Sequence, residues 1–245
     1  MSSRRVYRKD VSSARLISFT VKIKETDLWL AVSSSAFDPE LPALVEHLVW
    51  QQRHLLEAYI AQYPSFLESL EPCLIMPDAP PIVKKMTGAA NKAGVGPMAS
   101  VAGTLAEMIG IALLECSQEV IVENGGDVFM RVNEPVKVGI YAGKSPLSNK
   151  LALLIDPAKT PLGVCTSSGT VGPSLSFGCA DAAVVLSPST PLADAAATAM
   201  GNLVKSPDDI KNALEYARNL NDITGALLIC GEKMAAWGDI DLKEA

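Results

Sequence analysis

The stretch EVIVENGGDVFMRV, residues 119–132, decides the fold of this chain. Two apolar runs rich in β-branched residues flank the sequence Asn124-Gly125-Gly126-Asp127. Consecutive glycines between two such runs are a strong signal for a tight hairpin, because both central residues of a type I′ turn need a positive φ. We therefore predict strands at 119–123 and 128–132 that are joined by this turn.

Strand and helix patterns continue on both sides of the hairpin. Further strands are expected at 15–24, 28–32, 136–142, 150–155, 162–167, 181–187, 226–230 and 235–237. Helices are expected from Asp38 to about Gln62, over 81–92, 96–114 and 191–204, and from a cap at 206–209 to about Asn219, with an irregular segment at 64–81. Because consecutive strands are joined by short turns, the pattern predicts an α+β (mixed α/β) fold with layers of helices and a mixed or antiparallel sheet.

The composition is that of a chain with a large core. Its 245 residues fit one domain spanning 1–245, either as a single unit or as two closely packed halves. Hydrophobic residues make up 49% and charged residues 20%, which excludes a disordered chain. Aromatic residues are only 5%, so small aliphatic side chains must fill the core, and such cores suit helices packed closely on a sheet.

Charge and hydropathy narrow the classes of partner. The net charge of −6 argues against nucleic acid and anionic membranes as main partners. The most apolar stretch, Gly96–Leu114, includes Ser100, Thr104 and Glu107, which predicts a buried helix and not a membrane span. No apolar segment follows the polar first residues, so no signal peptide is predicted. We therefore expect a cytoplasmic protein that binds a small molecule, with a homodimer as one candidate assembly.

The five cysteines indicate reduced thiols. Their number is odd and no CxxC spacing occurs, which argues against a disulfide framework and a structural zinc site. Free cysteines usually pack as small apolar residues, so we expect Cys73, Cys116 and Cys230 to be buried.

Two loops have the composition of ligand-binding segments. The glycines at 124–127 let a ligand approach the backbone, although a hairpin turn alone would have the same sequence. The segment Cys165–Ser174 has five hydroxyl side chains and two glycines in ten residues, a pattern typical of an anion-binding loop and also of a flexible linker. The only histidines, His47 and His54, lie on the long helix, so a Cys165- or Ser-based hydrolase with a histidine base is a weaker alternative.

A third candidate lies on the alanine-rich helix predicted at 191–204. Asp194 and Thr198 are four residues apart and so share one face of this helix. One carboxylate with one hydroxyl suits a hard cation such as Mg²⁺ when backbone carbonyls, waters and substrate phosphates complete its shell. The alternative is that Asp194 only compensates a helix dipole.

These segments resemble those of the ApbE-like superfamily, which includes the FAD:protein FMN transferases. The 124–127 turn resembles the family's Gly-Gly-Asp element, the strand into Thr166-Ser167 resembles its Thr-Ser-Gly element, and Leu192–Ala199 is similar to its Ala-Asp-Ala-x-x-Thr-Ala signature. The resemblance covers about residues 90–237. Three further segments resemble a short branch of the superfamily: Gly94–Ala99, Gly172–Gly178 and Met234–Asp239.

The resemblance implies a layered ApbE-like fold and a site for Mg²⁺ and FAD or a related nucleotide. Asp194 and Thr198 would bind the metal, and Asp127 would orient the ligand or act as a base. The nucleotide would be held by the following residues: Asn124, Gly125, Gly126, Asp127, Thr166, Ser167 and Ser168.

The chain departs from the transferase pattern at two places. Pro97-Met98 stands where the transferases have a Lys-Gly pair, and Ser174–Gly178 replaces their His-x-x-Asp-Pro element, so the transferase histidine is missing. Our leading hypothesis is a divergent ApbE-like protein that binds a flavin or other nucleotide with Mg²⁺ and transfers a nucleotidyl group such as FMN from FAD. The alternative is a ligand-binding or assembly protein that kept the scaffold without the reaction.

Overall fold

A computed structural model describes residues 15–170 and 176–245. Its α-helices are α1 Leu41–Gln62, α2 Ser65–Glu68, α3 Pro81–Ala93, α4 Val101–Leu113, α5 Thr190–Leu203 and α6 Ile210–Arg218. Its strands are β1 Leu16–Ile23, β2 Thr26–Ser33, β3 Val120–Asn124, β4 Asp127–Arg131, β5 Val136–Gly139, β6 Leu151–Ile155, β7 Leu162–Ser167, β8 Ala182–Ser187, β9 Gly225–Cys230, β10 Lys233–Gly238 and β11 Leu242–Glu244.

The strands form two antiparallel sheets. An eight-stranded sheet has the order β1-β2-β3-β4-β7-β8-β9-β10, and a three-stranded sheet has the order β11-β6-β5. The hairpin at 119–132 forms β3 and β4, with Asn124 paired to Asp127. Gly125 and Gly126 have φ values of 72° and 115°, in the left-handed region that the type I′ turn requires. The predicted turn and the predicted α+β class are confirmed.

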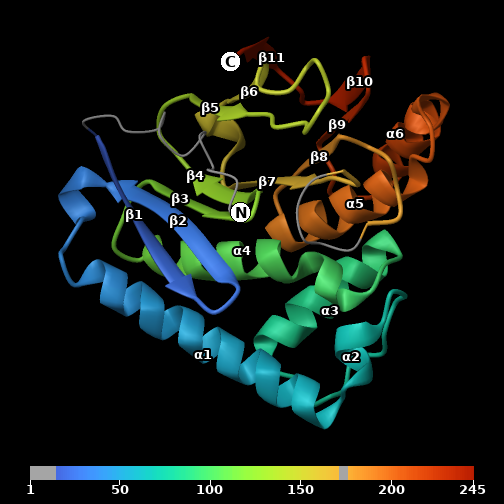
Figure 1. Cartoon of the computed structure of the whole chain (residues 1–245). Helices are drawn as coiled ribbons and strands as arrows, with labels where there is room; N and C mark the ends of the chain where they lie inside the picture. The colour runs from blue at the N-terminus through green and yellow to red at the C-terminus, as the bar shows by residue number, and fades with distance from the viewer. Residues whose placement is uncertain (1–14, 171–175) are drawn as a thin grey trace.

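The large sheet is covered differently on its two faces (Figure 1). The helices lie along one face, and the three-stranded sheet lies against the other. Side chains alternate between the faces along each strand. On β7, for example, Val164 packs in the core shared with the small sheet, while Cys165 packs in the core under α5.

Two carboxylates join α4 to α5 reciprocally. The Gly103 amide in the first turn of α4 donates to Asp194 Oδ2 on α5 at 2.8 Å, and the Thr190 amide at the start of α5 donates to Glu107 Oε2 on α4 at 2.8 Å. Each helix thus supplies an acceptor for an amide that has no partner within the other helix. A Cβ at position 103 would lie 2.7 Å from the Thr190 carbonyl oxygen, so glycine is needed for this approach. Lys85 Nζ also pairs with Glu107 at 2.8 Å.

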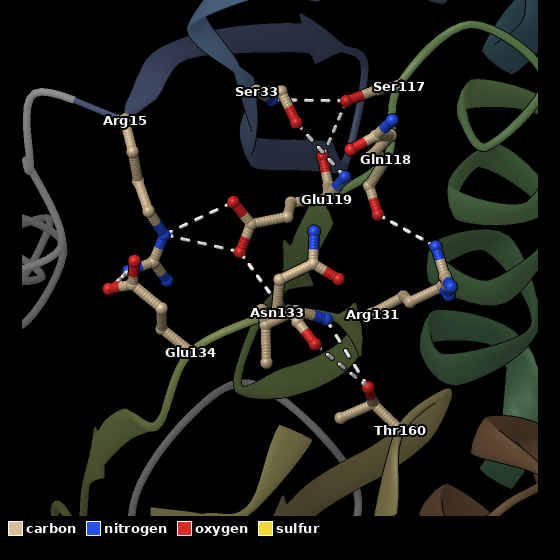
Figure 2. Close-up of polar contacts among 10 residues, drawn as sticks. Arg15, Ser33, Ser117, Gln118, Glu119, Arg131, Asn133, Glu134 and Thr160 are labelled. Carbon is tan, nitrogen blue, oxygen red and sulfur yellow. Dashed lines mark hydrogen bonds and ion pairs between the residues drawn. The ribbon is translucent and has the colours of Figure 1, made fainter. Parts of the chain in front are cut away.

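A second polar cluster lies at the start of β3, the end away from the Asn124–Asp127 turn (Figure 2). Glu119, just before β3, accepts from Arg15 Nε at 3.2 Å and from the Asn133 amide at 2.8 Å. Ser33 at the end of β2 bonds to Ser117 and to the Glu119 amide, which ties β2 to the entry of β3. These hydrogen bonds therefore fix the start of β3, the strand that leads to Asn124.

The element boundaries differ from the predicted ones in a few places. Lys24 adopts a φ of 51°, which shortens the first turn, so β2 begins at Thr26. Asp38 accepts the Glu40 amide at 2.8 Å, but α1 begins only at Leu41. The predicted irregular segment at 64–81 contains the short helix α2, and β11 was not predicted because three residues carry little periodicity.

None of the helices in residues 15–170 and 176–245 has both the length and the hydropathy of a membrane-spanning helix. Only α3 and Pro97–Leu113 taken together reach that length and hydropathy, and the two are bent by 103° relative to each other.

The cysteines are free, and their burial differs from the prediction. Cys165 and Cys230 are buried, as predicted for Cys230. The prediction was wrong for Cys116, which is exposed after the end of α4, and for Cys73, which is half-buried in a loop whose backbone bonds to Asn91. Both lie outside regular elements, where the apolar pattern does not indicate burial. Cys179 Sγ and Cys230 Sγ are 3.7 Å apart.

Thiol reactivity should follow this order of burial. In the native protein, Cys116 should react first with a chromogenic thiol reagent, and Cys165 and Cys230 should react last, because the thiol must be reached by the reagent. After unfolding without reductant, all five cysteines should react. A count of three after unfolding would reveal a disulfide and contradict the reduced state.

Removal of the Glu107 carboxylate should destabilise the protein. Glu107→Ala leaves the buried Thr190 amide without its acceptor, which costs about 1–3 kcal/mol of unfolding free energy. Glu107→Gln keeps an oxygen acceptor and should cost less. The control Lys92→Ala removes one partner of an exposed ion pair with Asp222 and should cost under about 1 kcal/mol. Denaturant unfolding measures all three, and a Glu107→Ala variant as stable as the parent would contradict the reciprocal cap.

Candidate functional site

Four elements meet on the helix-covered face of the large sheet. They are the β3–β4 turn, the end of β7, the first turn of α4 and the first half of α5. Because Val128 on β4 pairs with Val164 on β7, Asp127 lies beside the end of β7, next to Cys165 and the Thr166 amide. Asn124 Nδ2 donates to the Ala102 carbonyl oxygen at 3.2 Å, which joins the turn to α4. The structure thus brings Asp127, Thr166 and the start of α4 to one place.

The buried acids of this region repel one another. Burial raises the pKa of Asp127 to about 7, with a further rise from Glu123, while hydrogen bonds from Cys165 and Thr166 lower it. Burial and the negative charge of Asp127 raise the pKa of Asp194, against the lowering effect of the Gly103 and Ala102 amides. Burial, and then the two aspartates, raise the pKa of the Cys165 thiol. The ionised forms of these buried acids are therefore costly unless a cation or a proton compensates their charge.

The donor set of this region fits a hard cation. Asp127 and Asp194 are 8% and 9% exposed, and no Lys or Arg within residues 15–170 and 176–245 forms an ion pair with either. Buried carboxylates without a positive partner favour a bound cation electrostatically, and oxygen ligands are what Mg²⁺ prefers. Thr198, one turn beyond Asp194, is half-buried. Since the described part of the chain has no cluster of three His, Cys, Asp or Glu side chains, further oxygens must come from backbone, water or ligand.

Several predicted ligand groups already have partners in the protein. The Gly126 amide donates to Glu123 Oε1 at 2.9 Å, whereas Gly125 has open space around its Cα. Asp194 accepts a hydrogen bond from the Gly103 amide of α4. Its partner is thus the start of another helix, and not the dipole of its own helix, which was the alternative role considered from the sequence. The turn can therefore offer Gly125 and the Asp127 carboxylate to a ligand more readily than the Gly126 amide.

The hydroxyl-rich segment after β7 divides between the two faces of the sheet. Because Cys165 points to the helices, strand alternation directs the Thr166 side chain to the opposite face, so Thr166 contributes its backbone here. Ser167 returns to the helix side, and a methyl group on Gly201 of α5 would lie 3.9 Å from its Oγ. Ser168 Oγ accepts the Thr170 amide at 3.1 Å within the loop. Residues 171–175 of the predicted anion-binding segment lie outside the described residues.

Two residues that position this site were not predicted from the sequence. Glu107 and Gly103 on α4 hold α5 in place, and their only signal was a carboxylate and a glycine inside an otherwise apolar helix. Such a pattern can be found in a sequence, but its partner on α5 cannot.

The structure also has an open groove of about 620 Å³ that lies away from the buried carboxylates of the candidate site. It runs between α6 and β10, with Leu214 and Trp237 among its lining residues. It contains none of the predicted site residues, and its charged side chains are of both signs. We therefore assign the candidate site by its buried carboxylates and not by cavity size.

Comparison with known proteins shows the family. A family model described as AbpE bacteria matches residues 8–236. The UPF0280 protein of Methanocella arvoryzae is 45% identical over 218 residues, covering 89% of this chain and 86% of that protein. The UPF0280 protein of Methanococcus aeolicus is 43% identical over 230 residues, covering 92% and 91%.

Solved structures share the architecture at low sequence identity. The flavinyl transferase ApbE of Pseudomonas stutzeri, in its apo form, aligns with a TM-score of 0.58 at 17% identity, covering 94% of this chain and 96% of that chain. The flavin transferase ApbE of Vibrio cholerae aligns with a TM-score of 0.58 at 14% identity, covering 92% and 97%. The predicted layered ApbE-like fold is confirmed. The chain therefore belongs to the family described as AbpE bacteria and has the fold of the ApbE flavin transferases.

Proposed function

We propose that this protein binds FAD or a related nucleotide together with Mg²⁺ and transfers a nucleotidyl group, such as FMN from FAD, to an acceptor hydroxyl. The observation that carries the proposal is the pair of buried carboxylates, Asp127 and Asp194, without a positive partner among the described residues, at the start of α4. The fold is that of the flavin transferases ApbE of Pseudomonas stutzeri and Vibrio cholerae, which favours a flavin nucleotide over other ligands.

Each residue has a defined part in this proposal. Asp194 and Thr198 hold Mg²⁺, which when bound neutralises phosphate charge. Ser167 and Ser168 hold phosphate oxygens, and Asn124 and Gly125 shape the edge of the pocket. Asp127 accepts the proton of the acceptor hydroxyl, since a carboxylate with a pKa of about 7 is an effective base near neutral pH.

The reaction balances without a covalent enzyme intermediate. The acceptor oxygen bonds to the phosphorus on the FMN side of the FAD pyrophosphate. The bond from that phosphorus to the bridging oxygen breaks, and AMP leaves with the electron pair. Such a displacement requires mainly positioning and charge stabilisation from the protein.

A second candidate function is ligand binding without turnover. The only histidines of the chain, His47 and His54, are exposed on α1, so neither stands among the residues proposed to act on the ligand. Under this alternative the carboxylates and Mg²⁺ would hold the nucleotide, and no AMP would be released from FAD.

The setting of the proposed activity follows from the same properties. We propose a small-molecule nucleotide as ligand and the reducing cytoplasm as compartment, in keeping with five free cysteines. The net charge of −6 gives nucleic acid and anionic membranes no role.

Asp194→Asn should weaken Mg²⁺-dependent nucleotide binding. Asparagine keeps an oxygen for the Gly103 amide and removes the charge, so the fold should survive while FAD affinity in Mg²⁺ falls about tenfold, equivalent to about 1.4 kcal/mol. Calorimetric titration of FAD with and without Mg²⁺ measures this, with the exposed Asp208→Asn as matched control. If FAD binds equally well without Mg²⁺, or if Asp194→Asn binds like the parent, Asp194 is only a cap of α4.

Asp127 should make stability depend on pH. Its folded-state pKa, about 7, lies above its ordinary value of 3.8, so between these values the folded protein keeps a proton that the unfolded chain releases. The unfolding free energy should therefore fall as the pH rises from about 4 to about 7, by an amount on the order of 1–4 kcal/mol. Asp127→Asn should flatten this part of the profile.

Both proteins retain Cys165 and Asp194, whose pKa values the Asp127 charge raises in part, so the difference between the two profiles reports Asp127 together with its effect on these two groups. Denaturant unfolding at several pH values, without Mg²⁺, gives the profiles. Parallel profiles for the parent and Asp127→Asn would show that the pKa of Asp127 is not raised in the folded protein. They would contradict its proposed role as the base.

A further inference from the structure

Helix α5 carries a single polar stripe. Asp194, Thr198 and Asn202 follow one another at intervals of four residues and so lie along one face. Every other residue of the helix is buried except Leu203, while Thr198 and Asn202 are half-buried. The stripe thus leads outward from the buried carboxylate for about 12 Å along the helix axis.

Phe177 is fixed at the outer end of this stripe. Its amide donates to Asn202 Oδ1 at 2.8 Å, Ser176 Oγ donates to the same oxygen at 3.4 Å, and Lys205 Nζ donates to the Phe177 carbonyl oxygen. The next residue, Gly178, fits so closely that a Cβ there would lie 1.9 Å from the Gly201 carbonyl oxygen. The backbone that carries the Phe177 ring is therefore tied to α5 on both sides of that residue.

The ring itself is not buried. Its residue remains 50% exposed although its backbone is bonded to a helix whose other face is entirely apolar. An aromatic ring that is anchored through its backbone and left open presents a flat apolar surface, which is the feature on which nucleotide rings stack.

We propose that Phe177 is the stacking platform for the flat heteroaromatic ring of the bound nucleotide. This inference rests on the proposed function and adds to it the orientation of the nucleotide along α5. The phosphates lie between Asp194 and Ser167, which neighbours Gly201 of α5, and the ring lies beyond them at the outer end of the stripe, on Phe177. Thr198 lies between Asp194 and Asn202 on the same helix face.

The placement also accounts for the departure from the transferase pattern. Phe177 belongs to the segment Ser174–Gly178, which replaces the His-x-x-Asp-Pro element. Its described part, Ser176–Gly178, provides no proton-transfer group beyond one serine. Its contribution to the site is an apolar surface, so we expect Phe177 to determine affinity and ligand choice and not the chemical step.

Phe177→Ala should weaken binding of a nucleotide ring without weakening the fold. In Mg²⁺, FMN and ADP are titrated separately into the parent, Phe177→Ala and Phe177→Tyr, since FMN carries only the flavin ring and ADP only the adenine ring. The ligand whose ring stacks on Phe177 should bind Phe177→Ala at least about fivefold more weakly. Phe177→Tyr should restore its affinity, because tyrosine keeps the flat ring.

Two readouts separate stacking from a structural effect. If the flavin ring is the one that stacks, the fluorescence of bound FMN should be quenched in Phe177→Tyr, because a phenol donates an electron to the excited flavin, and should stay higher in the parent and in Phe177→Ala, because a phenyl or methyl group does not. The unfolding midpoint of Phe177→Ala should match that of the parent, since the ring is half-exposed. Tyr141→Ala, at an aromatic residue of similar exposure (42%), is the matched control and should change neither affinity.

The failures are distinguishable. If the parent binds neither FMN nor ADP nor FAD in Mg²⁺, the proposed function fails and this inference fails with it. If the parent binds but Phe177→Ala retains the affinity for both FMN and ADP, the proposed function stands and Phe177 is not the platform.

Discussion

The two hydrogen bonds between α4 and α5 are the contacts on which the arrangement of the candidate site depends. Each helix begins with amides that lack partners, and each receives one carboxylate from the other helix: Asp194 for Gly103 and Glu107 for Thr190. Because the helices run antiparallel on the same sheet face, the pair of bonds fixes both their separation and their register. The close approach also requires Gly103, since a side chain there would collide with Thr190 and Asp194.

This constraint buries a carboxyl group that has no positively charged side chain as partner among the described residues. Once Asp194 is drawn to the start of α4, it shares a buried region with Asp127 and the Cys165 thiol, and the pKa values of all three groups are raised, chiefly by burial. A folded protein tolerates such a region when a cation or a proton compensates it. The same contact that assembles the helices therefore supports the assignment of a cation and a phosphate-bearing ligand to this end of the sheet.

Much of the fold could be predicted from the sequence because its signals are local. The glycines at 125 and 126 specify their turn, and the small residues of α5 indicate close packing whatever the partner. The candidate site was predictable only in part. The position of Asp194 on its own helix follows from spacing, but its bond to Gly103 depends on how two helices distant in sequence meet. The direction of the Thr166 side chain, away from the helices, and the exposure of Cys116 likewise follow from strand register and chain path, which no local pattern contains.

The proposal that the carboxylate region beside α4 holds a nucleotide with Mg²⁺ is tested most directly by native mass spectrometry of the freshly purified protein, before and after incubation with FAD and Mg²⁺. We expect a non-covalent complex whose added mass equals one flavin nucleotide with Mg²⁺, and dissociation to the bare chain when a chelator removes the metal. A spectrum that contains only the bare chain after incubation would contradict the claim, and so would a flavin complex that survives the chelator unchanged.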